Sequence, residues 1–112
     1  MKKTIALLAL AVFLLPQLTL AQDWQCSCVQ GARRLGADIP LIDAKWFQLF
    51  PSQMPVVGGI VLLQYGDVWH VARISELLEE GVRIEEYNYR KCQYTTRIIK
   101  WDDEHLRGFW HN

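Results

Sequence analysis

The N-terminal 21 residues determine how much of this chain is left to fold. Two lysines precede an apolar run at residues 5–15, and the segment ends at Ala21, with Thr19 two residues before it. Positive charge, an apolar run and small residues in this order are typical of a secretory signal peptide. A membrane anchor is the alternative, but Pro16 interrupts the run before it reaches the ~20 apolar residues of a spanning helix. We therefore expect cleavage after Ala21.

Cleavage leaves 112 less 21, or 91, residues, which suffice for one small domain over residues 22–112. The chain has twelve basic and twelve acidic residues, and two lysines leave with the signal, so the mature formal charge is 10 − 12 = −2. This charge gives no reason to expect nucleic acid binding. We expect an exported monomer, periplasmic or secreted, that has no membrane contact after cleavage.

Three cysteines, Cys26, Cys28 and Cys92, remain in the mature chain. In an oxidising compartment two thiols tend to pair, and the third is left free. One disulfide and one free thiol is therefore the expected arrangement. The free thiol is either a working nucleophile or an inert buried side chain, and the composition leaves both possibilities open.

The order of the predicted elements indicates an α+β fold. Residues 27–36 predict a short helix that Ser27 caps and Gly36 ends, and residues 42–50 predict a second, aromatic-rich helix before a loop at 51–59. Strands are then predicted at 60–65, 68–74, 82–89 and 94–100, with a hairpin turn at 66–67 and an edge strand at 109–110. Helices followed by antiparallel strands predict N-terminal helices packed on a sheet.

Cys28 falls in the first turn of the first predicted helix. A thiolate is the nucleophilic form of cysteine, and a helix N-terminus stabilises negative charge and offers N–H groups for an oxyanion hole. Such a nucleophile needs a base and a group that orients the base. His70 lies in the second predicted strand, and Glu86 and Asn88 lie at i and i+2 of the next one. Because i and i+2 of a strand share a face, both could point at the imidazole of His70.

Five segments in this order resemble the CHAP domain, the cysteine, histidine-dependent amidohydrolase/peptidase family of the papain-like group. Each is short, and only the ordered set is specific. They span nearly all of the mature chain and read C-V-Q-G-A-R from Cys28, D-A-K-W-F at 43–47, P-V-V-G-G-I-V-L-L at 55–63, W-H-V-A-R-I at 69–74 and I-E-E-Y-N-Y at 84–89.

The resemblance implies a fold and an activity. The expected fold is papain-like, an antiparallel β-sheet with N-terminal helices packed on it. Cys28 would be the nucleophile, His70 the general base and Glu86 the group that orients the imidazole, while Asn88 would help to shape the site. The expected substrate is an amide bond in peptidoglycan, either the N-acetylmuramoyl-L-alanine bond or a stem or cross-bridge peptide bond. No cofactor or metal is expected. The alternative is a non-catalytic exported module, wall-binding or inhibitor-like, on the same scaffold.

Two assignments among the cysteines stay open at this point. Q-C-S at 25–27 resembles another common start of a CHAP domain, which would make Cys26 the nucleophile, whereas the helix capped by Ser27 favours Cys28. If the strand that carries Glu86 approaches His70, its end brings Cys92 near Cys26, and we expect these two to form the disulfide. A bond between Cys28 and Cys92, which would block the nucleophile, is the competing pairing.

Overall fold

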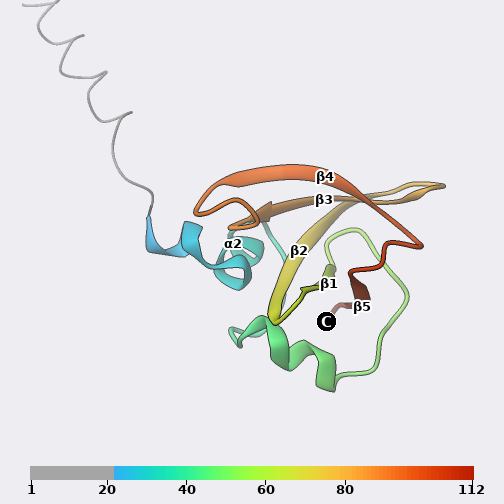
Figure 1. Cartoon of the computed structure of the whole chain (residues 1–112), viewed down its shortest axis with the longest axis horizontal. Coiled ribbons are helices and arrows are strands. Elements are labelled where there is room, and N and C mark those ends of the chain that lie inside the picture. The colour runs from blue at the N-terminus through green and yellow to red at the C-terminus, as the bar shows by residue number, and fades with distance from the viewer. Residues whose placement is uncertain (1–21) are drawn as a thin grey trace, which may run out of the picture.

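The computed structural model describes residues 22–112, and the expected signal peptide lies outside the described residues. Three short helices come first and five strands follow (Figure 1). The helices are the 3-10 helix η2 (Asp23–Cys26), the α-helix α2 (Cys28–Arg34) and the 3-10 helix η3 (Ala44–Leu49). The strands are β1 (Ile60–Tyr65), β2 (Val68–Leu77), β3 (Gly81–Tyr87), β4 (Tyr94–Lys100) and β5 (Leu106–Trp110).

All five strands form one antiparallel sheet in the order β4-β3-β2-β1-β5. The first four strands are joined by successive turns, and β5 returns to pair with β1 on the far edge. Ile99 of edge strand β4 packs in the same apolar cluster as Leu106 and Phe109 of the opposite edge strand β5. The sheet is therefore curled (Figure 1). Its two edges share one core.

The predicted fold class, α+β and papain-like with N-terminal helices packed on the sheet, is wrong. Within the described residues the domain is mostly β, with one five-stranded sheet and a single α-helix of seven residues. The second predicted helix, residues 42–50, is the 3-10 helix η3. Its two buried side chains, Ala44 and Phe47, are three residues apart, which is the period of a 3-10 helix. Over so short a segment, this spacing also fits the apolar pattern of an α-helix, so the sequence did not separate the two.

The predicted strands agree closely with the observed ones. The predictions for β1 and β4 match the observed bounds, and the turn between β1 and β2 contains Gly66 in the left-handed region, at φ 61°. The predicted second strand is extended by three residues, because β2 continues through a bulge to Leu77 and pairs with β3. The predicted edge strand at 109–110 is the end of β5.

Helix α2 begins and ends where local chemistry requires. The side chain of Ser27 accepts a hydrogen bond from the backbone N–H of Gln30 at 3.2 Å, which caps the helix one residue before Cys28. At the other end, Gly36 adopts φ 111°, and the N–H of Ala37 donates to the carbonyl of Ala32. Both signals were predicted from the sequence, and both are confirmed.

Two apolar cores lie on opposite faces of the sheet. One joins α2 and η3 to the outer face, with buried residues Val29, Ala32, Ala37, Ile39, Ala44, Phe47, Ile60, Leu62 and Val71. The other fills the inside of the curl, with buried residues Val61, Leu63, Ala72, Ile74, Val82, Ile84 and Ile99. Along β2 and β3, His70 and Glu86 point to the same face of the sheet as the second core. These two charged groups lie at the end of that core.

Gly31 allows α2 to pack directly on β3. A Cβ at this position would lie 2.5 Å from the Cβ of Tyr87, closer than side chains pack. Gly31→Ala should therefore push the helix away from the sheet and cost about 1–3 kcal/mol of unfolding free energy, as overpacking does. Urea unfolding measures this, with Gln30→Ala, an exposed helix position, as the control. Equal stability of the two variants would show that the helix does not rest on Tyr87.

Candidate active site

Cys28 is the first residue of α2, and it lines a cleft of about 490 Å³. The cleft lies between the start of this helix, the segment around Asp43, the β1–β2 turn at Asp67 and the ring of Trp69. Cys28 is half-buried and is a free thiol, because the disulfide uses the other two cysteines. Of the two candidate nucleophiles, which both line the cleft, only Cys28 therefore has a free thiol.

His70 contacts both Cys28 and Glu86. The His70 side chain is 6% exposed, and its Nε2 lies 2.8 Å from Oε1 of Glu86. The Cys28 thiol lies close enough to the same ring to raise its pKa. Because Glu86 takes Nε2, Nδ1 is the ring nitrogen left to accept a proton from the thiol. The structure thus brings together three of the four site residues predicted from the sequence, in the order thiol, imidazole and carboxylate.

The surroundings of His70 favour its protonated form. Burial lowers the pKa of His70, but the hydrogen bonds and charges of Cys28 and Glu86 outweigh it, so the pKa lies above its ordinary value. Burial likewise raises the pKa of Glu86, and hydrogen bonds and charges from His70 and Arg97 reverse this effect, so its pKa lies below the ordinary value. Glu86 is therefore a carboxylate at neutral pH although it is 0% exposed.

Glu86 is held by three partners from two neighbouring strands. Besides His70, Thr95 donates from Oγ1 to Oε2 at 3.1 Å. Arg97 donates from Nε to Oε2 at 3.0 Å and from Nη2 to Oε1 at 3.1 Å, a two-pronged contact between guanidinium and carboxylate. A buried carboxylate without such partners would take up a proton. Glu86 therefore stays ionised because His70 from β2 and Arg97 from β4 both stabilise its charge.

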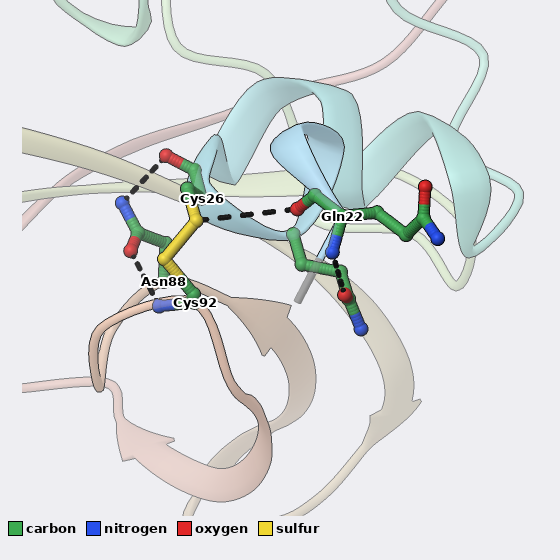
Figure 2. The surroundings of a disulfide bond; sticks show 5 residues. Gln22, Cys26, Asn88 and Cys92 are labelled. Atoms are coloured by element: carbon green, nitrogen blue, oxygen red, sulfur yellow. Dashed lines mark hydrogen bonds between the residues drawn. A yellow bond between two sulfur atoms is a disulfide. The ribbon is translucent and has the colours of Figure 1, made fainter. Parts of the chain in front are cut away.

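Asn88 lies at the disulfide rather than against His70. Its Nδ2 donates to the carbonyl of Cys26 at 3.0 Å, and its Oδ1 accepts from the N–H of Cys92 at 2.8 Å (Figure 2). The backbone of Asn88 is left-handed, at φ 66°, which ends β3 and turns the chain toward Cys92. Asn88 also lines the cleft beside Cys28. It thus ties the end of β3 to the segment just before α2.

The disulfide joins Cys26 to Cys92, as expected from the sequence (Figure 2). It connects the residue two positions before Cys28 to the turn that follows the strand of Glu86. A disulfide of this kind indicates an oxidising compartment, as for an exported chain. Within residues 22–112, no helix is long and apolar enough to cross a membrane.

Sequence reasoning missed Arg97, Thr95 and Trp69. Thr95 is the register partner of Glu86 across the β3–β4 ladder, and Arg97 lies on the same face of β4 two residues further on. Pairing the two predicted strands from their turn would have found both. The described residues contain no group of three or more His, Cys, Asp or Glu side chains that could hold a metal ion.

No family model, curated protein or solved structure matches the chain. The resemblance to CHAP domains therefore rests on the ordered motifs of the sequence.

Proposed function

We propose that this protein is an exported cysteine hydrolase of the CHAP kind that cleaves an amide bond in peptidoglycan. One observation carries the proposal. Cys28 has a free thiol, lines an open cleft and lies beside His70, whose Nε2 bonds a fully buried carboxylate. A nucleophile, a base and an orienting group within reach of one another are what covalent amide hydrolysis needs.

In the proposed reaction, the proton of Cys28 passes to Nδ1 of His70, which leaves a thiolate beside an imidazolium. The thiolate sulfur attacks the amide carbonyl carbon and forms the carbon–sulfur bond of a tetrahedral intermediate. Collapse of this intermediate breaks the carbon–nitrogen bond, and His70 gives its proton to the leaving amine. Water then attacks the thioester with His70 as base, and this step releases the carboxylic acid and restores the thiol. Glu86 stays ionised throughout and stabilises the imidazolium.

The start of α2 provides groups that could stabilise the tetrahedral oxyanion. The first N–H groups of a helix have no partner within the helix. Ser27 caps the N–H of Gln30, and within the described residues the N–H groups of Cys28 and Val29 have no acceptor. Both residues line the cleft. An oxyanion formed at the sulfur of Cys28 would lie close to these two donors.

Peptidoglycan is proposed as the substrate on two grounds. The ordered motifs resemble those of a family that acts on this polymer, and the disulfide indicates an oxidising compartment, where an exported protein meets the wall. The cleft is open and carries the polar side chains of Asp43, Lys45 and Asp67 around the apolar ring of Trp69. Such a surface suits a peptide with both polar and apolar parts.

Digestion of purified peptidoglycan with the exported protein, followed by mass analysis of the products, tests the proposal. An amidase would release whole stem peptides with a free N-terminal L-alanine. An endopeptidase would leave part of each stem on the sugar. Binding to peptidoglycan without any new product would contradict the proposal and favour the non-catalytic module.

A further inference from the structure

We propose that Arg97 is a positioning residue of this site, which holds Glu86 ionised and aimed at His70 so that the thiolate of Cys28 can form. This inference rests on the proposed Cys28–His70 pair and extends it to a fourth member on another strand. The motifs that resemble CHAP domains end at residue 89, before β4 begins.

Arg97 is fixed on several sides. Its guanidinium spans both oxygens of Glu86, and Nη2 also donates to the hydroxyl of Tyr65 at 2.7 Å. The guanidinium carbon lies 3.5 Å from the centroid of the Tyr89 ring, a stacked cation–π contact. The Tyr89 ring in turn lies 6.0 Å from the ring of His70. An arginine held this way has a single orientation, which it imposes on the carboxylate.

Arg97 also favours the charged state of Glu86. Burial raises the pKa of Glu86, and Arg97, together with His70, lowers it through both a hydrogen bond and a charge. Without Arg97, Glu86 would take up a proton at a higher pH, and His70 would lose its anionic partner. The imidazolium that must accept the proton of Cys28 would then be less stable.

The direction in which the alkylation profile shifts without Arg97 distinguishes two roles for this residue. If Glu86 stayed ionised without Arg97, the removal of a nearby cation would strengthen the attraction between Glu86 and His70. The imidazolium would then be more stable, and the alkylation profile would move to lower pH. The charged and titratable groups that face this pair are His70 from β2, Arg97 from β4, Tyr65 from β1, Tyr89 after β3 and Cys28 from α2.

The experiment is the rate of iodoacetamide alkylation against pH in the disulfide-bonded protein. Only Cys28 has a free thiol there, so the rate reports its thiolate without any substrate. In Arg97→Gln the profile should move to higher pH by about one unit, which makes alkylation about tenfold slower near pH 6. Arg97→Lys keeps the charge but loses the two-pronged contact with the carboxylate. It should therefore shift the profile less than Arg97→Gln does. With a muropeptide substrate, kcat should fall and KM should change little.

Arg73→Gln is the matched control. Arg73 is 22% exposed, against 23% for Arg97, and it bonds Glu85 at 2.6 Å on the neighbouring part of the sheet. The Arg73→Gln variant should be less stable than the natural protein but should have the same pH profile of alkylation. An unchanged profile or a shift to lower pH in folded Arg97→Gln would overturn the proposal, as would loss of folding in both Arg97 variants. Because alkylation needs no substrate, the test also stands if the protein hydrolyses nothing.

Discussion

Replacement of Cys28 by serine is expected to lower peptidoglycan hydrolysis on the order of 10³-fold or more, and His70→Ala should do the same. The sulfur is the proposed attacking atom, and the imidazole is the proton carrier. Members of such a unit act together, so the loss of either removes most of the covalent route. Turnover of a defined muropeptide by each variant, with circular dichroism to check the fold, measures this effect.

His111→Ala serves as the control for the histidine, because His111 follows β5 and its Nδ1 bonds only the neighbouring carbonyl of Asn112. It should retain full activity. The double variant Cys28→Ser/His70→Ala should be no less active than either single variant, since the two losses are not additive. Full activity in a folded Cys28→Ser protein would show that another group performs the chemistry.

Removal of the disulfide in Cys26→Ser/Cys92→Ser should cost about 4 kcal/mol of unfolding free energy. The two cysteines are 66 residues apart, and the loss of loop-closure entropy in the unfolded chain sets this magnitude. That is a large part of the 5–15 kcal/mol that typically stabilises a whole domain. Both residues are replaced together, so that no thiol is left to pair with Cys28. Denaturant unfolding of the natural and double-variant proteins measures the difference.

Asn88→Ala separates the covalent link from the hydrogen bonds beside it. It removes the contacts to the Cys26 carbonyl and the Cys92 N–H but keeps the disulfide, and it should cost about 1–2 kcal/mol. Peptide mapping without reduction should yield one linked pair, Cys26 with Cys92. A change of less than about 1 kcal/mol in the double variant, or a linked Cys28–Cys92 peptide, would show that the bond does not hold the fold as described.

The strands could be predicted from the sequence because the patterns that indicate them are local. An apolar run with β-branched residues predicted β1, and the turn at Gly66 predicted its hairpin with β2. The fold class could not be predicted in the same way. It depended on whether residues 42–50 form an α-helix, and nine residues with two buried side chains three apart do not distinguish that from η3. The pairing of β5 with β1 depends on the curl of the whole sheet, which no local pattern encodes.

Local chemistry in the sequence determined the start of α2 at Cys28, through the cap at Ser27, and the place of Glu86 on the strand that follows that of His70. The tertiary structure decided which contacts the side chains around the site make. The turn after β3 carries Asn88 to the disulfide and leaves Glu86 against His70. It also decided that Arg97 pairs with the ionised Glu86, because this contact depends on the register of β4. Side-chain periodicity is a property of one strand, whereas the charge of a buried carboxylate depends on every strand that packs around it.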